Sequence, residues 1–281
     1  MRLRGVRRSS NVEDRRRSGG GRVAVGGGLG GIALLVVLAI GYFAGVDVTP
    51  LLNDSTMQTS SERRELTPQE QLAGEFAAQV LATTEQVWGQ VLPEQGGIDY
   101  RPPVLVLFSG QTASPCGGAS GATGPFYCPL DQQAYLDTEF FATMEQRLGA
   151  EGDFAAAYVI AHEVAHHVQN LLGILPEVEK LRQQASEVQA NALTVRLELQ
   201  ADCLSGVWGS HVDGILEPGD VEEALNAARM IGDDLLQKRA GRVPQPHTFT
   251  HGTSAQRSGW FARGYEAGNI AACDTFSSDD I

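Results

Sequence analysis

Positive charge is scarce in this chain of 281 residues once its first 22 positions are set aside. Those positions hold eight arginines against Glu13 and Asp14, a charge of +6, so the rest of the chain carries −19 to give the formal total of −13. Binding to nucleic acid needs clustered positive charge that can meet the phosphates. The acidic body of the chain therefore excludes nucleic acid as an expected partner.

Charge of either sign is absent from Val23 to Val46, and 24 uncharged residues are long enough to cross a bilayer as a helix. Arginines before this run and Asp47 after it predict an N-terminus inside the cell and a body outside it. A cleaved signal peptide is the alternative, but no clear small-x-small cleavage site precedes Asp47. We therefore expect a single-pass protein of the cell membrane, with these parts: a basic cytoplasmic head (1–22), a transmembrane anchor (23–46), a polar tether (47–66) and an extracytoplasmic domain (67–281).

Cysteine is also scarce, with four in the chain, and no two of them form a C-x-x-C pair. A zinc site built from cysteines is therefore not expected. An even number in an exported segment is typical of disulfides, although four cysteines allow three pairings. We favour Cys116–Cys128, which would close a short glycine-rich loop, together with Cys203–Cys273. Unpaired buried cysteines are the alternative, above all at Cys203.

The pattern of apolar residues predicts a mostly helical α+β domain with a small sheet and no internal repeat. A capping box at Thr67 and Glu70 should begin a helix over 68–92. Residues 109–125 are rich in glycine, serine and alanine and should form a loop. Strands are expected at 103–108, 126–128 and 134–136, and helices from about 138 to 147, from 152 or 153 onward, in one or two pieces over 177–210, from 218 to about 236, and from 254 to about 267.

The motif His162-Glu163-Val164-Ala165-His166 lies within one of these predicted helices. Positions four apart share a helix face, so His162 and His166 can offer their imidazole nitrogens to one metal ion. Glu163 stands where its carboxylate can reach a metal-bound water. Zinc lowers the pKa of such a water toward neutrality, and a nearby carboxylate can then take its proton. The motif indicates a zinc hydrolase site, although chance alone supplies such a match in roughly one chain in a hundred of this length.

A third ligand is needed, because catalytic zinc normally takes three ligands from the protein and one water. Glu198 is the candidate, and Asp202 follows it one helical turn later in an apolar stretch. We expect Glu198 to bind the metal and Asp202 to accept the free ring N–H of a ligating histidine. Ordinary surface carboxylates are the alternative, but the apolar neighbours disfavour it.

The motif, with Glu198 to Asp202 after it, is similar to the gluzincin metallopeptidases, whose third ligand is such a glutamate. Further stretches resemble the bacterial putative neutral zinc metallopeptidase family, whose members are usually single-pass membrane proteins. These stretches are Asn11-Val-Glu-Asp-Arg-Arg16, Gly124-Pro-Phe-Tyr-Cys-Pro129, Phe249-Thr-His-Gly-Thr-Ser-Ala-Gln-Arg257 and Trp260-Phe261. The resemblance covers nearly the whole chain apart from the tether. It implies a zincin-like fold, a zinc ion and peptide-bond hydrolysis by His162, Glu163, His166 and Glu198.

Among the remaining histidines, His251 is the candidate for stabilising the tetrahedral oxyanion, as a downstream histidine does in many gluzincins. A structural, hydrogen-bonded histidine is the alternative there. His167 points about 100° away from His166 on the helix and should be structural or exposed. His247 and His211 are weaker candidates. Arg257 could hold the last helix through an acidic partner, although a solvated arginine is the simpler interpretation.

The sequence thus predicts a membrane-anchored zinc metallopeptidase with one zinc ion per chain and a peptide or protein substrate. The strand before the motif helix could align an extended peptide by strand addition. Two rival functions remain open: a binding or scaffold protein of the cell envelope that keeps the fold without turnover, and a zinc amidase acting on cell-wall material. A complete ligand set with Glu163 favours an enzyme, because a scaffold needs no general base.

Overall fold

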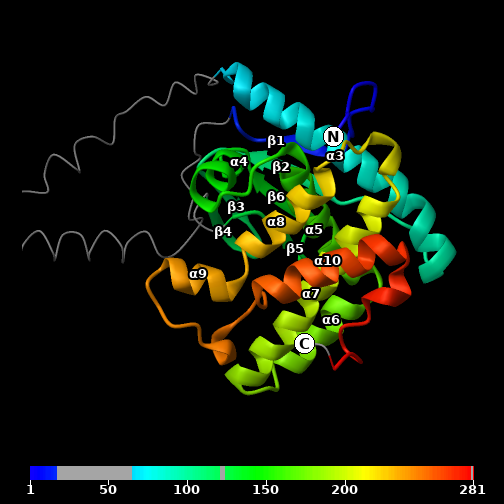
Figure 1. The fold of residues 1–281 in the computed structure, drawn as a ribbon. Coiled ribbons are helices and arrows are strands. Elements are labelled where there is room, and N and C mark those ends of the chain that lie inside the picture. The colour runs from blue at the N-terminus through cyan, green and yellow to red at the C-terminus, as the bar shows by residue number, and fades with distance from the viewer. Residues whose placement is uncertain (18–64, 121–123, 280) are drawn as a thin grey trace, which may run out of the picture. The chain divides into compact units, whose positions relative to one another are not determined.

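A computed structural model describes residues 1–17, 65–120, 124–279 and 281 of the chain (Figure 1). The chain divides into two compact units. One consists of Met1–Arg15 with Leu66–Ile281, and the other of Arg16–Glu65. The predicted transmembrane span, 23–46, lies outside the described residues, as does nearly all of the predicted tether.

Seven α-helices of seven or more residues make up about half of the described part of the first unit, in keeping with the predicted α+β class in which helices predominate. The capping box at Thr67 and Glu70 begins the first of them, as predicted. A single predicted helix over 218–236 is instead two helices, separated by Ile231 and Gly232. The helices are α3 (Pro68–Val91), α5 (Asp153–Leu171), α6 (Ile174–Arg182), α7 (Glu187–Ser210), α8 (Asp220–Met230), α9 (Asp233–Arg239) and α10 (Ser254–Ala267), with a short α4 (Phe140–Thr143).

A small sheet has the strand order β1-β2-β6-β5. Its first three strands, β1 (Val12–Asp14), β2 (Val104–Phe108) and β6 (Gln133–Asp137), run parallel, and β5 (Phe126–Cys128) pairs antiparallel with β6. A separate hairpin joins β3 (Gln111–Ser114) to β4 (Gly117–Ser120) within the segment that we expected to be loop. Its small residues carry almost no alternation of apolar and polar side chains, so the pattern did not reveal these strands.

The first 15 residues belong to the folded unit, which corrects the prediction of a separate cytoplasmic head. Val12 in β1 lies opposite Leu105 in β2, and the backbone N–H of Ser9 donates to the carbonyl of Ala78 in α3. The arginines of this segment meet acidic side chains of the same unit: Arg7 pairs with Glu85, and Arg8 with Glu75. Their charge therefore complements the acidic body and does not mark the inner side of a membrane.

No helix in the described part of the chain is long and apolar enough to cross a membrane. The prediction of a transmembrane helix and a single-pass membrane location is corrected: no described helix supports it, and 23–46 itself lies outside the described residues. The pairing of β1 with β2 supplies a physical reason. It joins the segments on either side of the predicted span in one sheet, whereas a single crossing would place them on opposite sides of a bilayer.

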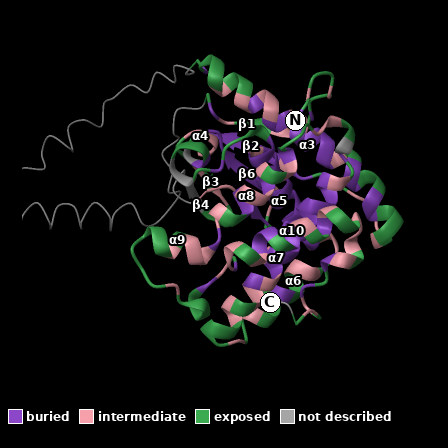
Figure 2. Ribbon diagram, viewed as in Figure 1, coloured by how far each residue is buried: buried purple, intermediate pink, exposed green. Residues whose placement is uncertain are grey.

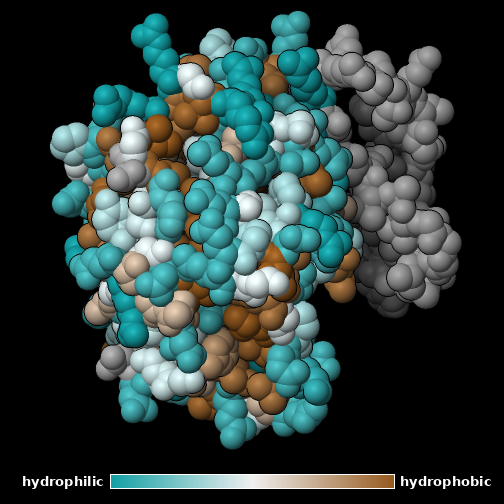
Figure 3. All heavy atoms as spheres, turned by 90° about the vertical axis from the view of Figure 1, so that its right-hand side faces the viewer, coloured by the Kyte–Doolittle hydropathy of each residue, from teal (hydrophilic) through white to brown (hydrophobic). Residues whose placement is uncertain are grey.

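The motif helix α5 occupies the middle of the unit and is buried along most of its length (Figures 1 and 2). It packs against α3, α7 and α8 and against the strands β5 and β6. Polar and apolar side chains both cover the outer surface in the view of Figure 3, with apolar side chains visible at its upper left and in its lower half. The buried setting of α5 means that its polar residues must find partners inside the protein.

Helix α10 crosses α7 at very short range (Figure 1). A Cβ atom on Gly264 of α10 would lie 1.9 Å from the carbonyl oxygen of Cys203, and one on Gly206 of α7 would lie 2.1 Å from the carbonyl oxygen of Phe261. Glycine at both positions lets the two backbones touch. This contact brings the C-terminal half of α10 beside the second half of α7.

Candidate metal centre

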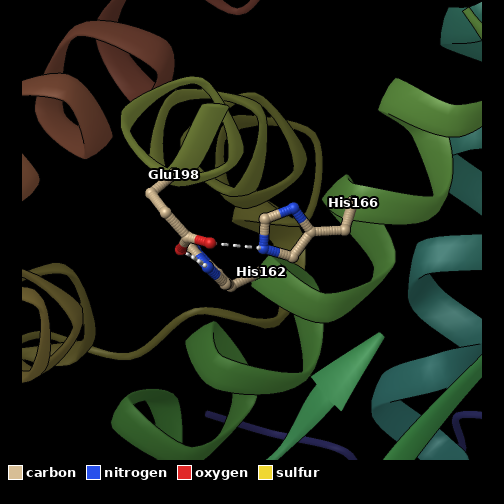
Figure 4. A group of neighbouring side chains, drawn as sticks. All are labelled: His162, His166 and Glu198. Carbon is tan, nitrogen blue, oxygen red and sulfur yellow. Dashed lines mark hydrogen bonds and ion pairs between the residues drawn. The ribbon is translucent and has the colours of Figure 1, made fainter. Parts of the chain in front are cut away.

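His162 and His166 on α5 face Glu198 on α7 (Figure 4). Nε2 of His162 lies 3.0 Å from one carboxylate oxygen of Glu198, and Nε2 of His166 lies 3.4 Å from the other. The two imidazole rings stand nearly perpendicular, with their centroids 4.8 Å apart. The structure thus brings together the three residues that the sequence singled out as metal ligands.

The donor set fits a zinc ion in both chemistry and spacing. One atom from each of the three residues lies within 4.8 Å of the others. Nitrogen and oxygen ligands about 2.0–2.1 Å from a tetrahedral zinc stand roughly 3.3 Å from one another, close to the two distances seen here. Imidazole and carboxylate are also the ligands of many catalytic zinc sites. The residues present can therefore hold zinc.

A charged network supports His162 on its other side. Nδ1 of His162 lies 2.9 Å from Oδ1 of Asp202, which is fully buried. Arg257 of α10 donates to both carboxylate oxygens of Asp202, from Nε at 2.9 Å and from Nη2 at 3.0 Å, and the Tyr158 hydroxyl donates to Oδ1 at 2.5 Å. Arg257 and Tyr158 therefore both donate to the carboxylate that pairs with the imidazole of His162.

The pKa values of this group follow from burial and charge together. Burial lowers the pKa of His162, but the carboxylates of Asp202 and Glu198 outweigh it and raise the value to about 10. Burial would raise the pKa of Asp202, and Arg257 and His162 hold it below its ordinary value instead. Histidine and carboxylate thus stabilise each other's charged forms in the metal-free protein.

Glu163 borders a cleft of about 710 Å³ that opens over the three predicted ligands. Its carboxylate makes no hydrogen bond or ion pair with another described residue, so it is free to meet a water or a substrate. Burial raises the pKa of Glu163, and the nearby His162 and His166 partly offset that effect. A raised carboxylate pKa suits a group that must take up a proton and release it again.

His251 also lines this cleft, on the segment between α9 and α10. Its Nδ1 lies 3.5 Å from Oδ1 of Asp233, whose other oxygen accepts backbone N–H groups from Thr250, His251 and Gly252. Burial lowers the pKa of His251, but Asp233 and the charge of Glu198 outweigh it and raise the value. The histidine is therefore held at the cleft by a carboxylate that is itself fixed.

The other histidines lie away from the metal centre. His167 is buried, with Nδ1 3.0 Å from the Tyr127 hydroxyl and Nε2 2.6 Å from the carbonyl oxygen of Arg101, which is a structural role. His247 and His211 are exposed.

Arg257 corrects the simpler sequence interpretation, because its side chain is buried against Asp202 and is not solvated. Arg257 meets Asp202 because α10 packs on α7, and the residues around Arg257 in the sequence do not predict this contact.

Two disulfides close the pairs that the sequence favoured. Cys116 bonds Cys128, and Cys203 bonds Cys273, which leaves no free cysteine among the described residues. The second bond lies next to Asp202 on α7 and ties the C-terminal segment to that helix.

Two residues of the site carry no motif of their own. Tyr158, four positions before His162, donates to Asp202, and Oε1 of Gln169, three positions after His166, lies 2.8 Å from Nδ1 of that histidine. Both share the helix face of the ligands they support, and helical spacing from the motif could have pointed to them.

Two histidines one turn apart, a glutamate beside the first and another glutamate from a second helix define an H-E-x-x-H metal site at the base of a cleft. Residues 1–276 match the model of the Putative neutral zinc metallopeptidase family, and the chain belongs to that family.

The chain is also similar to curated proteins that carry no assigned function. It is 49% identical over 286 residues to the uncharacterized protein YpfJ of Escherichia coli (strain K12), covering 98% of this chain and 99% of that protein. It is 42% identical over 212 residues to the uncharacterized proteins Mb2605 of Mycobacterium bovis and Rv2575 of Mycobacterium tuberculosis, covering 71% of this chain and 69% of each. No solved structure matches the chain.

Proposed function

We propose that the protein hydrolyses peptide bonds with one zinc ion per chain, held by His162, His166 and Glu198. The observation that carries the proposal is the meeting of two imidazole nitrogens and a carboxylate at a cleft that also contains the unpaired Glu163. Zinc bound there would polarise the scissile carbonyl and lower the pKa of a water. The ligands and the base come from two helices that pack directly on each other, so the site is preorganised.

Glu163 acts as the general base. Its carboxylate takes a proton from the attacking water and then passes it to the leaving amine nitrogen. The raised pKa of Glu163 brings its proton affinity closer to neutral pH, where both transfers are needed. General acid–base catalysis of this kind contributes about 10²–10⁴-fold to a rate.

His251 stabilises the oxyanion that forms as the carbonyl is attacked. Its raised pKa favours the imidazolium form, which can donate a hydrogen bond to developing negative charge. Asp233 holds the ring from the other side. This assignment predicts that His251→Phe lowers kcat with little effect on zinc content.

The substrate lies extended along β5, which ends the sheet. Residues 124–127 and Pro129 of this strand and its flanks line the cleft. The expectation of strand addition at the strand before the motif helix needs correction, because that strand, β6, is already paired with β2 on one side and β5 on the other. β5 can still accept an added peptide strand.

The function is tested with the full chain and a peptide library made from digested cellular protein. The full chain is required because residues 1–15 belong to the fold. We expect zinc-loaded protein to release new peptide termini, and Glu163→Gln to keep its zinc but lose about 10²–10⁴-fold in rate. Identical peptide profiles from the parent and Glu163→Gln would contradict peptidase activity and favour the scaffold. Release of products from purified cell wall, with no cleavage of the peptide library, would favour the amidase.

A further inference from the structure

The other ring nitrogen of His166 is supported by a neutral side chain. Its Nδ1 lies 2.8 Å from Oε1 of Gln169, and Gln169 is fully buried. His162, by contrast, has a carboxylate in the equivalent position. A side-chain amide can present either its oxygen or its nitrogen to a neighbour, so what orients Gln169 decides which proton state of His166 it favours.

Main-chain carbonyl oxygens determine which way the side-chain amides of Gln169 and Gln200 are turned. Nε2 of Gln169 donates to the carbonyl oxygen of Leu197 at 2.7 Å and to Oε1 of Gln200 at 3.1 Å. Nε2 of Gln200 in turn donates to the carbonyl oxygen of Cys273 at 3.0 Å. A carbonyl oxygen can only accept, so each carbonyl requires an amide nitrogen opposite it. Turning either amide over would bring two acceptor oxygens together in a buried setting.

The oriented amide leaves only its oxygen for His166. An oxygen acceptor requires the imidazole to carry its proton on Nδ1, and Nε2 then has a free lone pair directed toward Glu198. That form of the ring is the one that binds a metal through Nε2. The chain of amides ends at Cys273, which is bonded covalently to Cys203 on α7, so its far end is fixed as well.

We propose that Gln169 is a positioning residue for the metal centre, which sets the Nδ1–H form of His166 because Leu197 and Gln200 orient its amide. The inference rests on the proposed function only in that His166 binds zinc. It requires no peptidase activity.

The test substitutes Gln169 with methionine, which has a similar length and cannot accept the proton. We expect Gln169→Met to weaken zinc binding by about 10–100-fold in a chelator competition, as is usual when a hydrogen-bond partner of a ligating histidine is lost. The matched control is Gln79→Met. Gln79 also donates to two main-chain carbonyls, those of Leu3 and Val6, but lies in α3 away from the metal centre. Its zinc affinity should equal that of the parent.

A spectroscopic readout separates positioning from a general loss of stability. In cobalt(II)-loaded protein, each ligating histidine with a protected Nδ1–H gives a strongly shifted, exchangeable proton resonance. We expect one such resonance for His162 and one for His166 in the parent and in Gln79→Met. In Gln169→Met the His166 resonance should vanish or exchange rapidly with solvent, while the His162 resonance stays.

The proposal would be overturned if Gln169→Met bound zinc within twofold of the parent affinity and also kept both resonances. If Gln169→Met does not fold, Gln200→Met carries the test, because it keeps Gln169 but removes one of the acceptors that orient it. Faster exchange of the His166 proton is then expected, and unchanged exchange contradicts the proposal. A parent protein that binds neither metal would refute the proposed function itself, which is a different result.

Discussion

The two histidines of the metal centre are held by unlike surroundings. His162 rests on a buried ion pair, in which Asp202 is neutralised by Arg257 and receives a further hydrogen bond from Tyr158. His166 rests on neutral amides, Gln169 and Gln200, whose partners are carbonyl oxygens. In both histidines the opposite ring nitrogen, Nε2, is directed to the same carboxylate, that of Glu198.

The surroundings of His162 and of His166 should therefore differ in how much stability is lost when one side chain is removed. A buried charge that loses its partner leaves the other charge uncompensated, which is costly. Loss of a neutral amide side chain lowers the free energy of unfolding by about the contribution of one hydrogen bond, provided that its former partners keep other hydrogen bonds. The charged side of the centre should therefore be the more fragile one.

Arg257→Met should have the largest effect on stability. It removes the guanidinium from the buried carboxylate of Asp202 and leaves only the imidazolium of His162 beside it, and we expect the free energy of unfolding to fall by about 3–5 kcal/mol. Urea denaturation of the metal-free full chain measures this. Arg263→Met is the control on the same helix, because Arg263 only covers the ring of Trp260, and its loss should cost about 0.5–1 kcal/mol. Equal losses in the two variants would contradict the role given to Arg257.

Removal of the Cys203–Cys273 disulfide should come second. The bond joins residues 70 apart, and replacing both cysteines by alanine should lower the free energy of unfolding by about 2–4 kcal/mol. The comparison is the Cys116–Cys128 bond, which joins residues 12 apart. Its removal should cost about 1.5 kcal/mol less, since the loop entropy grows with the logarithm of loop length. If thermal or urea unfolding shows a larger loss of stability for the Cys116–Cys128 bond, loop length does not determine the contribution of these disulfides.

Tyr158→Phe removes one hydroxyl that donates to Asp202, and Arg257 stays in place. A hydrogen bond to a charged group contributes about 1.5–3 kcal/mol, so a loss in this range is expected in urea denaturation. An effect below about 0.5 kcal/mol, the size usual for an exposed position, would mean that the charged network does not depend on this donor.

Gln200→Met should have the smallest effect. Gln169 keeps its bond to the carbonyl of Leu197, and the carbonyl of Cys273 keeps the backbone N–H of Thr275 as a donor. We expect a loss of about 0.5–1.5 kcal/mol, measured as above. A loss as large as that of Arg257→Met would refute the contrast between the charged and neutral surroundings.

Much of the fold could be predicted because helix ends and apolar spacing are local signals. The capping box at Thr67 marks the start of α3, and the helix predicted from Ser254 to about Ala267 is α10. The same spacing placed His162, His166 and Glu198 on two helices. It could not place β1, because three residues with little apolar character become a strand only through pairing with the buried β2.

Only some of the residues that support the two histidines could be predicted from the sequence. Asp202 lies one turn after Glu198, so helical spacing revealed it. Arg257 reaches Asp202 through the close contact of α10 with α7, and nothing in the sequence around Arg257 reports that packing. The basic residues near the N-terminus misled the prediction for the same reason, since their acidic partners on α3 lie 67 or more positions away.

Zinc content is the most direct test of the metal centre. Metal analysis of the purified full chain should find about one zinc per chain in the parent and in Glu163→Gln, because Glu163 is not a ligand. Glu198→Ala should contain little or no zinc, since it removes one of three protein ligands. A parent chain without zinc, or Glu198→Ala with as much zinc as the parent, would contradict the site described here.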